Sequence, residues 1–259
     1  MLRFRHHTDD GIAEATAGSP AELDGYRLAI PIEPPEVWCA GVTYERSRDA
    51  RVEESAVQDV YTLVYEAERP ELFMKDAACR RTVGPGESIG VRSDSGWDVP
   101  EPEIGVVIGG DGAPAGLTIG NDVSSRSIEG ENPLYIAQAK TFAGACAIGP
   151  AILVPDDWDA PLDICMRIVD PSGREVYAGE TSSAKMRRSF AELVGWLLRD
   201  NPVPPGSVLL TGTGLVPPDG FTLEPGQTVE ITVPPIGTLT NPVVSAAELT
   251  TRARSVTHA

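Results

Sequence analysis

Three carboxylates in the first half of the chain have the spacing of a shared site. Glu101 and Glu103 lie one residue apart in the segment DVPEPEIGVVI, and Asp122 follows in LTIGNDV, at the end of the next expected strand. Successive side chains of a strand point to opposite faces, so Glu101 and Glu103 face the same way. A hairpin-like connection would bring Asp122 beside them. Such a cluster is unfavourable unless the carboxylates pair with cations or coordinate a metal.

The types of these residues limit which metal is expected. Oxygen ligands without Cys or His suit a hard divalent ion such as Mg²⁺, Mn²⁺ or Ca²⁺. Pro100 and Pro102 have no N–H, so this stretch cannot lie inside a regular ladder, and an irregular strand edge is a suitable host for a metal. The alternative is that the glutamates are solvated surface charges, and the E-x-E pattern alone leaves that alternative open.

Lys140 is the second candidate for chemistry. The chain has three lysines against 18 arginines, and Lys140 lies among small and apolar residues in AQAKTFAGACAIGP. It either extends to solvent or pairs with a carboxylate, or it lies near the metal, where burial and the nearby cation lower its pKa toward useful acid–base chemistry. No histidine competes for this role in the body of the chain, since all three lie in the terminal tails, at His6, His7 and His258.

The order of these motifs resembles the fumarylacetoacetate hydrolase superfamily. The motifs are E-x-E, then GND, an isolated Lys, GP, the TGTG turn and LEPGQTVEI followed by IGTLTNPV, and they span the chain from about Val37 to Val243. The resemblance implies a β-rich α+β fold, the mixed β-roll of that superfamily, in a homodimer or homotetramer. It also implies that Mg²⁺ is held by Glu101, Glu103 and Asp122 and is chelated by a small 2-oxo acid substrate.

Within the superfamily, RPELFMKD, SSRSIEGENPLYIAQAK and TGTGLVP most resemble the dehydratases of 2-keto-3-deoxy sugar acids. That resemblance implies Glu71 and Lys140 as the catalytic pair. The chain departs from the hydrolases and decarboxylases at Ser47, in GVTYERSRDAR, where those enzymes commonly carry His. Activation of water for C–C cleavage would need that His, whereas a dehydration does not.

The implied function is therefore a metal-dependent hydro-lyase of sugar acid catabolism. It would remove water from a 2-keto-3-deoxy aldonic acid through a metal-stabilised enolate, with the roles of base and acid open between Lys140 and Glu71. The alternatives are an acylpyruvate hydrolase, an oxaloacetate decarboxylase or a 2-hydroxymuconate-type isomerase of the same superfamily. A further alternative is a non-catalytic binding protein that has kept the fold.

Other polar residues are weaker candidates. A tight turn, a structural ion pair or a solvated loop explains each of them about as well as contact with substrate. The expected substrate-binding residues are Lys75, Arg126, Thr211, Gly212 and Thr213. The residues expected in a lid that orders over the substrate are Tyr44, Arg46 and Arg48.

The elements that must position these residues are mostly short strands punctuated by Pro and Gly. Helical periodicity is clear only over about residues 48–68 and in SFAELVGWLLRD, where Ser189 and Glu192 have capping-box spacing. This pattern favours a β-rich α+β domain over a parallel α/β sheet. We expect a small N-terminal segment with a lid-like loop over residues 1–65 and the catalytic domain over residues 66–259.

Composition excludes some partners. The formal charge of −17 argues against nucleic acid, because contacts with phosphates need a basic surface. No run approaches 18 consecutive apolar residues, so no membrane span is expected. The N-terminus has no apolar stretch typical of a signal peptide, and we expect a cytoplasmic location.

Overall fold

The fold is organised around a large mixed sheet with the order β2-β1-β12-β10-β9-β15-β4-β5. The computed structural model describes residues 1–54 and 58–256. Two short strands extend the sheet, β3 beside β1 and β6 beside β12. The bounds are β1 Leu2–Thr8, β2 Gly11–Ala17, β3 Leu28–Ala29, β4 Glu36–Gly41, β5 Glu71–Ala77, β6 Thr82–Val83, β9 Pro102–Ile108, β10 Pro114–Asp122, β12 Cys146–Leu153 and β15 Val208–Leu210.

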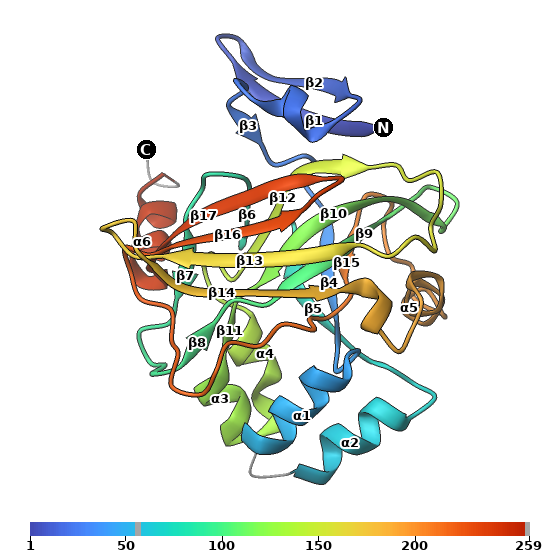
Figure 1. The fold of residues 1–259 in the computed structure, drawn as a ribbon, viewed down its shortest axis with the longest axis vertical. Helices are drawn as coiled ribbons and strands as arrows, with labels where there is room; N and C mark the ends of the chain where they lie inside the picture. The colour runs from blue at the N-terminus through green and yellow to red at the C-terminus, as the bar shows by residue number, and fades with distance from the viewer. Residues whose placement is uncertain (55–57, 257–259) are drawn as a thin grey trace.

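A second, five-stranded sheet packs against the first, and its order is β14-β13-β16-β17-β7. Figure 1 shows these strands lying across the middle of the molecule, with the β1–β3 segment projecting at one end. A separate pair is formed by β8 and β11. The bounds are β7 Ile89–Val91, β8 Asp98–Val99, β11 Ser124–Ser125, β13 Asp163–Val169, β14 Glu175–Ser182, β16 Thr228–Val233 and β17 Gly237–Ser245.

The main core lies between the two sheets. Ile104 and Val106 of β9 and Ile119 of β10 share one buried cluster with Ile164 of β13 and Ile231 of β16. Val107 belongs to a different cluster, because side chains alternate along β9. The odd-numbered positions of β9, which include Glu103, therefore face away from the main core. The strand-rich α+β architecture expected from the sequence is confirmed.

Short helices gather below the sheets in the view of Figure 1, where α1 to α4 lie together. The single helical stretch expected over about residues 48–68 is present as two helices, and residues 55–57 lie outside the described part. The segment after Asp122, where the sequence predicts no helix, forms two short helices, α3 and α4. The bounds are α1 Glu45–Glu54, α2 Gln58–Glu66, α3 Arg126–Glu131, α4 Ile136–Lys140, α5 Phe190–Leu197 and α6 Ala246–Val256.

The helix expected in SFAELVGWLLRD is confirmed as α5. Its N-cap is Ser189, whose hydroxyl accepts a hydrogen bond from the Glu192 N–H at 3.1 Å. The Glu192 carboxylate pairs with Arg188, one residue before the cap. Within the described residues, no helix is long and apolar enough to cross a membrane.

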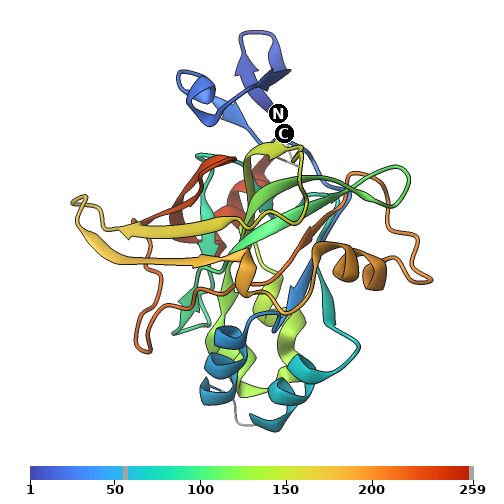
Figure 2. The same ribbon diagram turned by 45° about the vertical axis from the view of Figure 1, so that its right-hand side comes forward.

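The segment 186–188 contacts the residues just before α1 and just after α2. Before α1, Tyr44 forms a β-bridge with Met186, and the Arg187 N–H donates to the Thr43 carbonyl at 2.9 Å. After α2, the Arg188 guanidinium donates to the carbonyls of residues 67 and 68. Figure 2 shows the two helices at the end of the molecule opposite the β1–β3 segment. The pair is thus anchored at its base. The expected division of the chain at residue 65 stays a prediction; β4 lies inside the large sheet, between β15 and β5.

Candidate active site

The register of β9 and β10 brings the three carboxylates together. Glu103 lies opposite Gly120, and the Asp122 N–H donates to the Glu101 carbonyl at 2.9 Å, so Asp122 lies across from Glu101. Position 120 requires glycine, because a Cβ there would overlap the side chain of Leu210. Ligand oxygens of Glu101, Glu103 and Asp122 all lie within 4.8 Å of one another, and the three residues are buried. The cluster expected from the spacing is therefore present.

The expectation that the proline-containing stretch lies outside a regular ladder holds for Pro100 and Glu101 but not for Pro102. Pro102 is the first residue of β9 and pairs in register with Asn121. The Glu101 N–H is held by the Asn121 side chain instead, with 3.2 Å between nitrogen and oxygen. The backbone of Glu101 is thereby fixed outside the regular ladder, and its carboxylate is directed into the cluster.

Two cations contact the carboxylate of Glu101. The Lys140 ammonium lies 2.6 Å from one oxygen, Oε2, and the Arg126 guanidinium lies 2.8 Å from the other, Oε1. Both cations come from the α3–α4 segment. Lys140 also contacts Asp122 at 3.0 Å and the Ser124 hydroxyl. The end of α4 therefore places one ammonium between two members of the cluster.

Lys75, on β5, forms an ion pair with Asp122. Its ammonium pairs with Asp122 Oδ1 and donates to the carbonyl of Val123 at 2.9 Å. The side chain is fully buried and packs over the ring of Phe142, 5.7 Å from its centroid. This geometry is the structural ion pair that the sequence left open, and Lys75 does not line the cavity described below.

Glu103 is the carboxylate of the cluster whose ionised form is clearly disfavoured by burial. Burial, followed by the nearby charges of Asp122 and Glu101, raises the pKa of Glu103 well above its ordinary 4.5. The Gly212 N–H, 2.6 Å from Glu103 Oε2, partly offsets this. Gly212 has φ +91°, and a Cβ at this position would meet the Thr43 hydroxyl and the Ala40 carbonyl, so the close approach requires glycine.

The donor set fits Mg²⁺. Three buried carboxylates converge from one strand pair, and oxygen ligands of this type are those that hard divalent cations prefer. A divalent cation would also supply positive charge beside Glu103. Glu101, Glu103 and Asp122 are the residues that would hold it.

A narrow, partly open cavity of about 20 Å³ lies beside the cluster. Glu71, at the start of β5, lines it together with Lys140. Glu71 pairs in register with Gly41 of β4, and a Cβ on residue 41 would overlap the Glu71 carboxylate. The structure thus places both members of the expected catalytic pair at one cavity. Its lining residues are Ala40, Gly41, Val42, Ser47, Tyr61, Glu71, Phe73, Glu101, Glu103, Asp122, Glu129, Lys140, Gly212 and Thr213.

The expected substrate-binding residues divide into two groups. Gly212 and Thr213 line the cavity, whereas Arg126 and Thr211 do not. Arg126 serves Glu101, as described, and the Thr211 hydroxyl donates to the carbonyl of Ile104 at 2.9 Å inside the sheet. The Gly212 N–H donates to Glu103 and is therefore not open to a substrate carboxylate.

None of the three expected lid residues lines the cavity. Tyr44 is buried at the base of α1, Arg46 is exposed, and Arg48 pairs with Glu45 and Asp49 on the outer side of the helix. Ser47, between the two arginines, is the buried residue of this turn and lines the cavity. The position at which hydrolases of the superfamily carry His is thus directed into the site.

Tyr61 and Glu129 also line the cavity. Tyr61 was not predicted at the site, and Glu129 was expected only as one residue of a polar loop after Asp122 that could line the pocket. The signal that was missed is the spacing Arg126-x-x-Glu129, because on a helix residues three apart lie on the same side.

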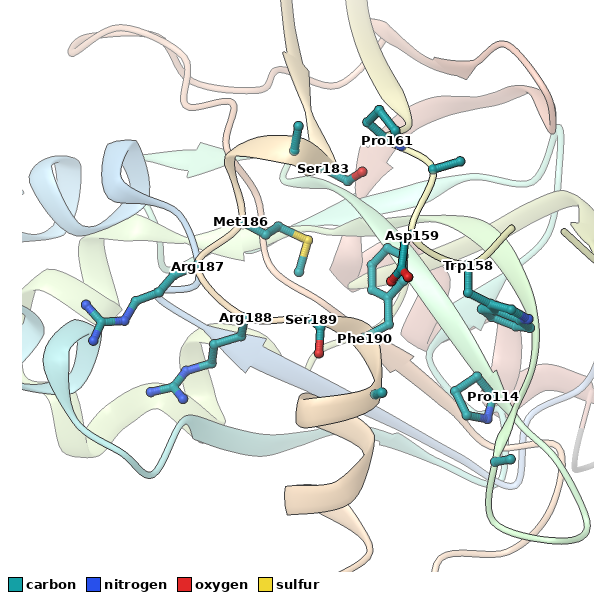
Figure 3. Close-up of a pocket in the computed structure, with 14 residues that line it drawn as sticks. Pro114, Trp158, Asp159, Pro161, Ser183, Met186, Arg187, Arg188, Ser189 and Phe190 are labelled. Atoms are coloured by element: carbon teal, nitrogen blue, oxygen red, sulfur yellow. The ribbon is translucent and has the colours of Figure 1, made fainter. Parts of the chain in front are cut away.

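A larger cavity, of about 640 Å³, lies elsewhere and has a different character. Figure 3 shows Trp158, Pro114, Met186 and Phe190 around it, with Arg187 and Arg188 pointing away from the apolar side chains. It shares no lining residue with the small cavity and contains no carboxylate cluster. The chemistry of the lining residues, and not cavity size, identifies the site.

These features define a β-roll protein with a buried carboxylate cluster suited to a divalent metal. The family model for the fumarylacetoacetate (FAA) hydrolase C-terminal domain matches residues 36–244. The chain belongs to this family.

Two curated relatives are closely similar. The chain is 50% identical over 245 residues to a probable 2-keto-3-deoxyxylonate dehydratase of Haloferax volcanii, covering 93% of this chain and 84% of the relative. It is 45% identical over 235 residues to 2-dehydro-3-deoxy-D-arabinonate dehydratase of Saccharolobus solfataricus, covering 88% and 78%. A solved structure of 2-keto-3-deoxy-D-arabinonate dehydratase complexed with magnesium and 2,5-dioxopentanoate matches with a TM-score of 0.80 and 37% identity, over 95% of this chain and 99% of that one.

Removing any one of the three carboxylates should weaken Mg²⁺ binding, because each supplies an oxygen to the same cluster. We expect the Glu101→Gln, Glu103→Gln and Asp122→Asn proteins each to bind Mg²⁺ at least about tenfold more weakly than the parent in calorimetric titration. Glu131→Gln, an exposed change on α3, should bind like the parent. If all three amide variants bind the ion with the parent's affinity, the ligand set is wrong.

Mg²⁺ binding should also depend on pH through Glu103. A carboxyl whose pKa is raised takes up its proton at a pH above 4.5, and the protonated group is a poor ligand. Affinity should therefore be highest well above this pKa and should fall as the pH is lowered toward 4.5. Titrations from pH 8 downward measure this dependence. A constant affinity down to pH 5 would contradict the prediction.

Proposed function

We propose that this protein is a Mg²⁺-dependent dehydratase that converts a 2-keto-3-deoxy aldonic acid to a dioxo acid and water. The observation that carries the proposal is the placement of Lys140 and Glu71 at one cavity with the cluster of Glu101, Glu103 and Asp122. Similarity to two dehydratases of such acids over most of both chains supports the choice of reaction.

The reaction needs one proton removed at C3 and one delivered to the departing C4 hydroxyl. Bound Mg²⁺ would polarise the 2-oxo group and stabilise the negative charge that develops when the C3 proton leaves. Lys140 would take that proton in its neutral amine form, after giving up its own proton, because its Nζ lies beside Glu101 and Asp122 of the cluster. Glu71, at the start of β5, would protonate the C4 hydroxyl, which leaves as water. A first product with a C3–C4 double bond and a C5 hydroxyl isomerises to the 2,5-dioxo acid.

The cavity itself implies that α1 and α2 open. About 20 Å³ accommodates roughly one water molecule and is far too small for a five-carbon acid. Ser47 of α1 and Tyr61 of α2 line the cavity, so displacement of these helices would admit the substrate. Tyr44, Arg46 and Arg48 would contribute to this motion from its base and outer side, with no contact to substrate in the closed form.

Ser47 favours a lyase over the hydrolase alternative. A serine at this position offers no imidazole to activate water for cleavage of a C–C bond. Since Ser47 is buried and directed into the cavity, its identity bears on the chemistry. We include in the proposal a cytoplasmic location, a homodimer or homotetramer, and a small 2-oxo acid as the partner, without nucleic acid.

Product analysis tests the proposed reaction. With Mg²⁺, the purified protein should convert 2-keto-3-deoxy-pentonate to 2,5-dioxopentanoate with no loss of carbon, and chelation of the metal should stop turnover. The same protein should cleave acetylpyruvate poorly. Rapid release of pyruvate from acetylpyruvate, with no dehydration of the pentonate, would establish the hydrolase alternative instead.

Lys140→Met should lower kcat by roughly 10²-fold or more, because a group that transfers a proton in the transition state is lost. Arginine at the same position should not restore activity, since guanidinium keeps its proton. Lys185→Met provides the control, because Lys185 is exposed and outside the cavity.

Deuterium exchange at C3, followed by NMR, isolates the step assigned to Lys140. Exchange should be lost in Lys140→Met and kept in Lys185→Met. If the Lys140→Met protein exchanges the C3 proton at the parent rate, Glu71 becomes the candidate base.

A further inference from the structure

The cavity has a sheet side and a helix side. The carboxylate cluster and Glu71 come from strands or strand ends, and Lys140 lies beside the cluster at the end of α4. Ser47, Tyr61 and Glu129 come from α1, α2 and α3, which lie below the sheets in Figure 1. A ligand that occupies this cavity with its 2-oxo acid group at the cluster would therefore lie beside these three helical residues.

Glu129 is the acidic residue on the helix side. It is 4% exposed and lies three residues after Arg126, the residue that pairs with the carboxylate of Glu101. The start of α3 is fixed by Ser125, whose hydroxyl accepts a hydrogen bond from the Ile128 N–H at 3.3 Å. α1 packs against α3 and covers this end of the cavity. The position of Glu129 relative to the cluster is thus set by the same contacts that hold Glu101.

A buried carboxylate selects strongly among ligand groups. When ionised it only accepts hydrogen bonds, and its two oxygens offer about four acceptor sites, so a polar partner within the protein leaves others for a ligand. A hydroxyl group can donate to it, an alkyl group cannot, and a second carboxylate is repelled. The substrates of the oxaloacetate and hydroxymuconate alternatives end in a second carboxylate, whereas an aldonic acid ends in hydroxyl groups.

We propose that Glu129 determines substrate specificity by accepting a hydrogen bond from a terminal hydroxyl of the substrate and by disfavouring 2-oxo acids with a second carboxylate. The inference rests on the proposed function, since it assumes that the 2-oxo acid group binds at the cluster. It adds to that function the recognition of a neutral, hydroxylated end. Glu129 acts here in selection and not in proton transfer at C3.

Three ligands of equal chain length separate these effects: 2-oxopentanoate, 5-hydroxy-2-oxopentanoate and 2-oxoglutarate. They share the chelating group and differ at C5, which is methyl, hydroxymethyl or carboxylate. For the Mg²⁺-loaded parent, we expect the hydroxyl compound to bind roughly tenfold more tightly than 2-oxopentanoate and 2-oxoglutarate to bind roughly tenfold more weakly. Isothermal titration measures all three without any turnover.

Glu129→Gln removes the charge and keeps the shape. In this variant, the affinities for 5-hydroxy-2-oxopentanoate and for 2-oxoglutarate should both approach the affinity for 2-oxopentanoate. Glu131→Gln, on the exposed side of the same helix, should keep the parent's affinity ratios. A purely structural role for Glu129 would weaken all three ligands alike and leave the ratios unchanged, which would overturn the proposal.

The parent alone also tests the proposal, whether or not the variant folds. Binding of 2-oxoglutarate as tight as that of 5-hydroxy-2-oxopentanoate would overturn the role of Glu129 and leave the proposed dehydration intact. Failure of the parent to bind any of the three ligands would overturn the chelating site, and the proposed function with it.

Discussion

The antiparallel register of β9 and β10 is the constraint on which the site depends. It places Asp122 across from Glu101 and Glu103 across from a glycine, all on the face of the sheet that points away from the main core. A shift of one residue in either strand would exchange its two faces and would bury carboxylates in the apolar core between the sheets. The apolar packing between the sheets therefore fixes the register, and the register fixes the geometry of the ligands.

Three like charges on a buried face need compensation, and the surrounding elements supply it. Lys140 and Arg126 contact Glu101 from the α3–α4 segment, and Lys75 contacts Asp122 from β5. Each of these cations is nearly inaccessible to solvent, so each would be costly to bury alone. The short helices and β5 are thereby tied to the cluster electrostatically as well as by packing. Glu103 is held by a backbone N–H, which makes it the member for which an added cation matters most.

The parts of the site that follow from a simple period could be predicted from the sequence. A spacing of two residues placed Glu101 and Glu103 on one face, and the length of the connection placed Asp122 beside them. The strand-rich fold followed from frequent Pro and Gly. The helices α3 and α4 could not be predicted in this way, because five or six residues are too few to show helical periodicity.

The partners of individual charged residues could also not be predicted from the sequence. Arg126 and Lys75 were expected at the substrate and instead contact the carboxylates, since the distance from a side chain to its neighbours depends on how remote segments pack. The side of α1 that faces the cavity could not be predicted either. Two arginines, Arg46 and Arg48, were expected over the substrate, whereas Ser47 between them is the residue that lines the cavity.

The small volume of the cavity bears on the order of events in one turnover. A space for about one water molecule can enclose a reacting ligand only if the helices close after the ligand enters and open again before the product leaves. If the helices move as proposed, the anchors at residues 186–188 would be the fixed ends of a hinge whose opening is a separate event from bond breaking. Solvent viscosity, which slows such motions but leaves proton transfer within a closed site largely unaffected, would distinguish a rate set by the hinge from a rate set by the chemistry.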